Sequence, residues 1–245
     1  MGRIAIIAGT GFRELDIPGS AEVVDVDTPF GQPSGPILRW KDLEHDIFFL
    51  PRHGLDGSKP PHEVNYRANL WAIHQAQVDY VLAVNAVGGI ASDAKPGMLV
   101  IPDQLIDYTW GRRQTFFDGD KDKLLHIEFT MPYCELLRQR LIELAGDLKL
   151  RFLAAGTYAV TQGPRLETAA EVNRLQRDGC DLVGMTGMPE ACLAKELELN
   201  YACCAVVVNS AAGKGDAGIH AEIDLYLKQG MQQVTRLFVG FLDSL

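Results

Sequence analysis

Short apolar runs alternate with helical patterns along the whole chain, and this alternation limits the folds that the chain can adopt. We predict strands at residues 3–8, 22–27, 46–51, 80–85, 98–106, 156–161, 181–184 and 201–209. Helices are predicted at residues 64–75, 133–146, 167–178, 189–196 and 222–242. Strands that are apolar throughout are typical of parallel sheets buried on both faces. The pattern therefore predicts an α/β fold, with a mixed, largely parallel central sheet flanked by helices and a single domain over residues 1–245.

The last predicted helix shows the clearest periodicity. Its apolar residues Met231, Val234, Phe238, Phe241 and Leu245 recur at a spacing of three or four. This spacing places them on one stripe, which we expect to pack against the sheet.

The charge of the chain excludes some partners. The formal net charge is −9, which argues against nucleic acid or an anionic membrane as the ligand. An anionic ligand would need local cations, and the candidates are Arg52, His53, Arg165 and Lys214. No apolar run reaches the length of about 18 residues that a membrane span needs.

The cysteines and the N-terminus favour a reduced, cytoplasmic protein. The five cysteines have no CxxC spacing, and Cys203 and Cys204 lie inside an apolar run, where core packing is the better interpretation. The N-terminal segment MGRIAIIAGTG runs directly into a strand without the pattern of a secretory signal.

The residues that follow the predicted strands hold most of the candidate chemistry. In α/β sheets, ligands bind beyond the strand ends. An Arg-His pair at residues 52–53 and a small-residue turn at 85–89 suit an anion, which charged side chains and backbone N–H groups can bind. The other strand-end segments are residues 9–11, 162–167, 185–186 and 209–210.

Several familiar motifs are incomplete. Gly9-Thr10-Gly11 lacks the third glycine of a dinucleotide loop, because Glu14 stands there, so an oxidoreductase is only a weak alternative. Residues 211–215 lack the Ser or Thr that follows Lys in a P-loop. His62-Glu63 is followed by Tyr66 rather than the second histidine of a zinc-protease helix, and no other spacing indicates a metal. No Gly-x-Ser-x-Gly elbow is present.

Taken together, the strand-end segments resemble the trimeric purine nucleoside phosphorylase and 5'-methylthioadenosine phosphorylase family. The resemblance covers nearly the whole chain and is specific because of the order and spacing of its segments. These are IIAGTG (6–11), RHG (52–54), VNYRANLWA (64–72), NAVGGI (85–90), GMLVIPDQLIDYT (97–109), TQGPRLET (161–168), VGMTGMPEA (183–191) and VVVN (206–209).

The resemblance implies phosphate-dependent cleavage of the glycosidic bond of a purine nucleoside, with no metal or organic cofactor. Inorganic phosphate would be the co-substrate. The residues that would hold it are Thr10, Arg52, His53, Ala86 through its backbone N–H, and Thr186. Arg52 would present its planar fork to two phosphate oxygens. Thr186 as a simple turn residue is the alternative.

The resemblance implies that Met185 contacts the ribose, with core packing as the alternative, and that Gly88 is also part of the nucleoside site. Methylthioadenosine phosphorylases carry Asp-x-Asp after the last core strand, where this chain has Asn209-Ser210-Ala211. The related 6-oxopurine enzymes pair such an Asn with a Glu that Glu167 matches. Asn209 and Glu167 are therefore the expected catalytic residues, and a 6-oxopurine is the expected base. For Glu167, a favourable position at a helix start is the alternative.

At the sugar, the resemblance implies a 5'-methylthio group. His126 resembles a histidine that a neighbouring subunit lends to the 5'-pocket, although a surface histidine is the alternative. Ile223 would contact a methylthio group, whereas His220 could instead face a 5'-hydroxyl. The expected substrate is methylthioinosine, cleaved to hypoxanthine and 5-methylthioribose 1-phosphate by a homotrimer or a dimer of trimers. A methylthioadenosine phosphorylase, a general inosine or guanosine phosphorylase, and a non-catalytic nucleoside-binding protein remain alternatives.

Overall fold

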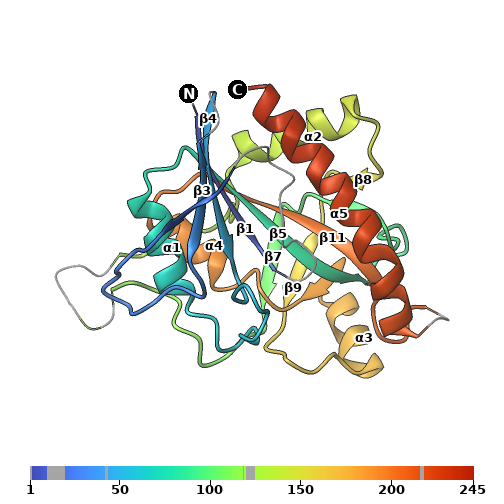
Figure 1. Ribbon diagram of the computed structural model, residues 1–245. Coiled ribbons are helices and arrows are strands. Elements are labelled where there is room, and N and C mark those ends of the chain that lie inside the picture. Colours follow the sequence, from blue (N-terminus) through green and yellow to red (C-terminus); the bar gives the residue numbers. More distant parts are fainter. Residues whose placement is uncertain (1, 10–19, 42–43, 118, 120–124, 216–217) are drawn as a thin grey trace.

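The computed structural model describes residues 2–9, 20–41, 44–117, 119, 125–215 and 218–245 (Figure 1). The strands are β1 (Gly2–Ala8), β2 (Glu22–Val24), β3 (Ile37–Lys41), β4 (His45–Pro51), β5 (Tyr80–Gly89), β6 (Leu99–Val100), β7 (Gln104–Asp107), β8 (Phe152–Leu153), β9 (Thr157–Val160), β10 (Leu182–Gly184) and β11 (Tyr201–Ser210). The helices are α1 (Tyr66–Gln75), α2 (Glu135–Asp147), α3 (Ala169–Arg177), α4 (Glu190–Glu196) and α5 (Ile219–Asp243).

The described strands form one mixed sheet. Its main path runs β2-β3-β4-β1-β5-β10-β9-β7, and β11 pairs with β5 and continues the sheet to β6 and β8. The pairs β1–β4, β1–β5, β5–β11, β9–β10, β7–β9 and β6–β8 are parallel. The antiparallel pairs are β2–β3, β3–β4, β5–β10 and β6–β11.

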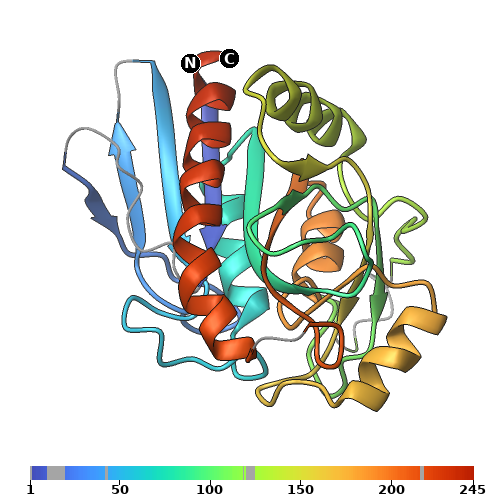
Figure 2. The ribbon, with the colours of Figure 1, turned by 90° about the vertical axis from the view of Figure 1, so that its right-hand side faces the viewer.

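Helices cover both faces of this sheet, which confirms the predicted fold class. Alternate residues of β1 point to opposite faces of the sheet. Ile4 and Ile6 belong to the core beneath α2 and α5, whereas Ala5 and Ile7 belong to the core beneath α1 and α4. In Figure 1, α5 and α2 lie on one side of the strands and α1 and α4 on the other, and Figure 2 shows α5 running along its face of the sheet. Both faces are apolar, as the continuous apolar strands predicted.

Helix α5 lies unusually close to β11. A Cβ atom at Gly230 would lie 2.1 Å from Cγ1 of Val206, so only glycine permits this approach. The predicted stripe at Met231, Val234, Phe238 and Phe241 is buried. The prediction for Leu245 was wrong, because the helix ends at Asp243 and Leu245 is 43% exposed.

The other differences concern the lengths of strands. Strand β5 runs to Gly89, so residues 85–89, predicted as a small-residue turn, belong to the strand. The predicted strand 98–106 is two strands, β6 and β7, separated by Pro102, which has no N–H for a ladder. Strands β3 and β8 were missed, the first because its sequence ILRWK mixes charges with apolar residues and the second because it has only 2 residues. The strand predicted at 22–27 ends at Val24. Helix α3 begins at Ala169, after the N-cap Thr168, so Glu167 lies before the helix and not in its first turn.

The structure also bears on two predictions, the burial of the cysteines and the membrane-spanning length of the helices. Cys203 and Cys204 are 1% exposed within β11, as their apolar surroundings predicted. No helix in the described part of the chain combines the length and the apolar composition needed to cross a bilayer.

Candidate active site

An opening along one edge of β5 creates the candidate site. Because β11 pairs with β5 over residues 81–89, β1 and β10 must share the opposite edge. On that edge, β1 pairs with residues 80–83 of β5, and β10 pairs with residues 88–89. Residues 84–87 therefore have a strand partner only on the β11 side. The neighbour along this edge changes from the parallel β1 to the antiparallel β10, and the opening lies at the carboxyl end of β1. In α/β sheets, ligands bind beyond the carboxyl ends of the strands.

A cavity of about 220 Å³ lies at this opening. It is lined by Gly9, Arg52, His53, Pro61, Val84, Ala86, Val87, Gly88, Leu166, Glu167, Val183, Gly184, Met185, Thr186, Val208, Asn209, Ala211, Ala212, Ile219, Ile223 and Leu227. These residues belong to β5, to α5 and to the last residues of β10 and β11, or they follow β1, β4, β9, β10 and β11.

The cavity brings most of the predicted site residues together from distant parts of the sequence. Those that line it are Arg52, His53, Ala86, Gly88, Glu167, Met185, Thr186, Asn209 and Ile223. Thr10 lies outside the described residues. His126 is exposed and does not line the cavity of its own chain, and His220 is also exposed and does not line it. The suggestion that His220 faces a 5'-hydroxyl therefore has no support from the cavity lining within one chain.

Arg52 occupies the point where β1 and β5 separate. It is 1% exposed, and its Nη1 donates to the Val84 carbonyl at 2.8 Å. Its Nε and Nη2 donate to the two carboxylate oxygens of Glu190 at 2.6 and 2.7 Å. Burial alone would lower the pKa of Arg52, but the attraction and hydrogen bonds of Glu190 outweigh it and raise that pKa.

This arrangement corrects the expectation for Arg52. The planar fork faces Glu190 rather than the cavity, so it does not present two parallel N–H groups to an anion. Glu190 is fully buried and also accepts a hydrogen bond from the Tyr201 hydroxyl at 2.8 Å. The sequence analysis did not single out Glu190, although it is part of the segment VGMTGMPEA that carried the resemblance.

His53 lies beside Arg52 at the same end of the cavity. Its Nδ1 is 2.8 Å from the Lys59 carbonyl, which requires that this nitrogen carries the proton. Burial, and then the charge of Arg52, lower the pKa of His53, so the neutral ring is favoured. A Cβ at Gly9 would lie 2.7 Å from Cδ2 of this ring, so the glycine makes room for it.

Thr186 is oriented by a residue that sequence reasoning missed. The Asn85 amide donates to the Thr186 hydroxyl oxygen at 2.6 Å, and the Asn85 oxygen accepts from the Cys203 thiol at 3.2 Å. Besides accepting from Asn85, the Thr186 hydroxyl has one hydrogen of its own that it can donate. Asn85 is buried in β5 with its partner 101 residues away, so only the fold reveals the pair.

The backbone of β5 adds a donor at Ala86. Within a strand, the N–H and C=O groups of alternate residues point to the same edge. The Val84 carbonyl points into the opening, since it accepts from Arg52 there. The N–H of Ala86, two residues further on, therefore points into the same opening.

A β-bulge positions Asn209 at the other end of the cavity. The register of β11 against β5 shifts between Val207 and Asn209, which pairs with Gly88. Bulges of this kind redirect side chains and are common beside active sites. The Asn209 amide nitrogen donates one hydrogen to the Ser210 carbonyl at 2.7 Å, which leaves its second hydrogen and its oxygen for a ligand.

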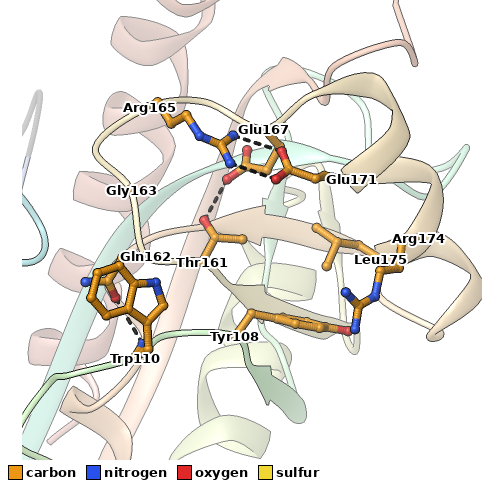
Figure 3. Close-up of a pocket in the computed structure, with 10 residues that line it drawn as sticks. All are labelled: Tyr108, Trp110, Thr161, Gln162, Gly163, Arg165, Glu167, Glu171, Arg174 and Leu175. Carbon is orange, nitrogen blue, oxygen red and sulfur yellow. Dashed lines mark hydrogen bonds and ion pairs between the residues drawn. The ribbon is translucent and has the colours of Figure 1, made fainter.

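Glu167 is oriented by Thr161, whose hydroxyl donates to Oε1 of Glu167 at 2.6 Å (Figure 3). The other carboxylate oxygen remains able to accept. Glu167 also lines a neighbouring cavity of about 360 Å³, whose wall includes Tyr108, Trp110 and Arg165. Glu167 thus forms part of the wall of both cavities.

The other two candidate cations do not reach the first cavity. Arg165 pairs with both oxygens of Glu171 at 2.7 and 2.9 Å, as Figure 3 shows. Lys214 donates to Asn173 and Gln176 on α3. Neither lines the cavity that holds Asn209. Among the described residues, no group of three or more His, Cys, Asp or Glu side chains could hold a metal ion.

The two ends of the cavity can therefore do different chemistry. The end at His53, Ala86 and Thr186 offers a backbone donor and a hydroxyl donor next to a buried guanidinium. The end at Asn209 and Glu167 offers an amide and a carboxylate, which suits a planar ring with both donors and acceptors.

Comparison with known proteins identifies the family. A sequence profile described as the phosphorylase superfamily matches residues 3–243. A probable S-methyl-5'-thioinosine phosphorylase of Pseudomonas syringae pv. tomato is 52% identical over 241 residues, 98% of each chain. The 6-oxopurine nucleoside phosphorylase of Pyrococcus furiosus is 41% identical over 98% of this chain and 92% of its own. The structure of Schistosoma mansoni methylthioadenosine phosphorylase with adenine matches with a TM-score of 0.91 and 30% identity, over 99% of this chain and 91% of that one. The chain belongs to the phosphorylase superfamily.

Proposed function

We propose that this enzyme, a pentosyltransferase, cleaves S-methyl-5'-thioinosine with inorganic phosphate to give hypoxanthine and 5-methylthioribose 1-phosphate. The observation that carries the proposal is the make-up of the cavity that holds Asn209. That cavity combines Asn209 and Glu167 at one end with an apolar wall from α5. The relatives named as S-methyl-5'-thioinosine phosphorylases support the same substrate.

The base end favours a 6-oxopurine. The free oxygen of Glu167 can accept the N1–H of hypoxanthine, whereas adenine presents only a lone pair at N1. An unmatched buried acceptor costs about 1–3 kcal/mol, which corresponds to roughly one to two decades in rate if it persists in the transition state. Ala211, which lines the cavity, offers no carboxylate to an adenine amino group.

The sugar end favours an apolar 5'-group. Helix α5 contributes Ile219, Ile223 and Leu227 to the cavity, at a spacing of four residues that places them on one face of the helix. Their side chains can contact a methylthio group but cannot hydrogen-bond a 5'-hydroxyl. Desolvating that hydroxyl without a partner would be unfavourable.

In the proposed reaction, the bond between the ribosyl carbon and purine N9 breaks, and its electron pair moves to the purine. A phosphate oxygen forms the new bond to the ribosyl carbon. Thr186, the Ala86 N–H and the remaining Nη1 hydrogen of Arg52 would donate to phosphate, together with Thr10. The neutral His53 would accept a hydrogen bond at Nε2 from the hydroxyl of monohydrogen phosphate. The purine anion would take up this proton through water once the glycosidic bond has broken, which gives neutral hypoxanthine. Asn209 would stabilise the negative charge that develops on the purine at N7.

Three substrates compared under one set of conditions test the proposal. We expect methylthioinosine to be cleaved with a higher kcat/KM than methylthioadenosine or inosine, and only when phosphate is present. Methylthioadenosine as the best substrate would contradict the base assignment, and inosine as the best substrate would contradict the sugar assignment. Binding without phosphate-dependent turnover would indicate a nucleoside-binding protein.

We also infer that the active unit is a trimer, or a dimer of such trimers, in which His126 reaches the sugar end of a neighbouring cavity. His126 is exposed and does not line the cavity of its own chain, which supports this assignment. Sedimentation at the enzyme concentration used for kinetics should show the trimer. Full activity in a monomer would contradict the shared site.

A further inference from the structure

Arg112 joins two loops beside the cavity without lining the cavity itself. Its guanidinium donates to the Met185 and Met188 carbonyls at 2.8 and 2.6 Å through Nη1. Through Nη2 it donates to the carbonyl of Gln162 at 2.8 Å and of Thr161 at 3.3 Å. These two pairs of carbonyls belong to the segments that follow the neighbouring strands β10 and β9.

Each of the two loops carries one end of the candidate site. The loop after β9 begins with Thr161, whose hydroxyl orients Glu167. The loop after β10 begins with Met185 and Thr186, which line the other side of the cavity. A single guanidinium therefore connects the loop at the base end to the loop at the phosphate end.

The chemistry of this contact requires arginine. Arg112 is half-buried, and within the described part of the chain no carboxylate forms an ion pair with it, so carbonyl dipoles surround its charge. It also lies 5.5 Å from the centre of the Tyr66 ring. A planar guanidinium can donate along two edges at once, whereas a lysine ammonium is a single point on a flexible stem.

We propose that Arg112 is a positioning residue that fixes the base loop and the phosphate loop relative to each other. This inference rests on the proposed function in one respect, since it takes the purine to bind at Glu167 and the phosphate at Thr186. Nucleophile and leaving group must lie on opposite sides of the ribosyl carbon, so the relative position of the two loops controls the rate. A displacement of about 1 Å can reduce a rate by roughly 100-fold.

The test compares variants that disturb both loops with variants that disturb one. Arg112→Met should lower kcat/KM by roughly 100-fold and raise the KM of both nucleoside and phosphate. Thr161→Val should raise mainly the KM of the nucleoside, and Asn85→Ala mainly that of phosphate. Arg112→Lys keeps the charge but should recover less than about a tenth of the lost rate. Arg177→Met, at an exposed arginine on α3, is the matched control and should behave as the wild type.

Wild-type kinetics from Arg112→Lys would overturn the proposal, because charge alone would then suffice. So would an Arg112→Met protein that is less heat-stable yet has normal kcat and KM values where it is folded, since Arg112 would then be only structural. Hydrogen exchange without substrate separates this inference from the proposed function. Amides of residues 161–163 and 185–188 should exchange faster in Arg112→Met than in the control, whichever nucleoside the enzyme cleaves. Unchanged exchange in both segments would also overturn the proposal.

Discussion

Glu190→Gln is expected to destabilise the protein by about 3–5 kcal/mol, although the change replaces one oxygen with an NH2 group. Glu190 is fully buried and holds the guanidinium of Arg52, which is itself 1% exposed. Removing the negative charge leaves Arg52 as an uncompensated buried cation. The new amide NH2 would also face an N–H group of Arg52, so that two hydrogen-bond donors would meet. Equilibrium urea unfolding, at one protein concentration, measures the loss.

The matched control is Glu171→Gln, which breaks an exposed pair with Arg165. Exposed pairs contribute about 0–1 kcal/mol, so this variant should unfold close to the wild-type midpoint. The double variant Arg52→Met with Glu190→Gln removes both charges and should recover much of the lost stability, but not phosphorolysis. A loss below about 1 kcal/mol for Glu190→Gln would show that the pair does not behave as a buried ion pair.

Asn209→Asp combined with Ala211→Asp should move the preference of the enzyme toward 6-aminopurines. Both residues line the cavity, so the two carboxylates could accept from an adenine amino group and from a protonated N7. We expect the ratio of kcat/KM for methylthioadenosine over methylthioinosine to rise by roughly 10- to 100-fold. The same two substrates, assayed at saturating phosphate, give the ratio directly.

Asn173→Asp makes the same chemical change on the exposed surface of α3 and is the control for altered charge. Its ratio should equal that of the wild type. If the double variant is folded, cleaves methylthioinosine and keeps the wild-type ratio, Asn209 and Ala211 do not contact the base.

The sequence predicted the long buried strands and most of the residues that the fold gathers around one cavity, because both depend on local patterns. Continuous apolar runs identify β1, β4, β5 and β11, and residues at or just beyond the ends of these strands, such as Arg52 and Asn209, line the cavity. Strand β3 has intermediate exposure over most of its length, so its sequence lacks that signal. Pro102 was a local sign that residues 98–106 form two strands, but no local pattern could show that β6 pairs with β11 and β7 with β9.

The residues that orient the site could not be predicted in the same way. Glu190 and Arg52 are 138 residues apart, and Arg112 lies 73 residues from Met185. Such pairs form only when the chain has folded. Nothing in the residues on either side of each partner indicates that it will contact the other. The guanidinium of Arg52 was assigned to phosphate because no carboxylate near it in the sequence could accept from its N–H groups. The carboxylate that does so, Glu190, is distant in the sequence.

The opening along β5 has a consequence for how this cavity can be redesigned. The donor at residue 86 is a peptide group, and its direction depends on strand pairing rather than on which amino acid occupies the position. Alanine could be exchanged for another small residue to reshape the floor of the cavity, and the donor would stay in place. Sequence identity at this position is thus a poor guide to whether the backbone donor has been kept.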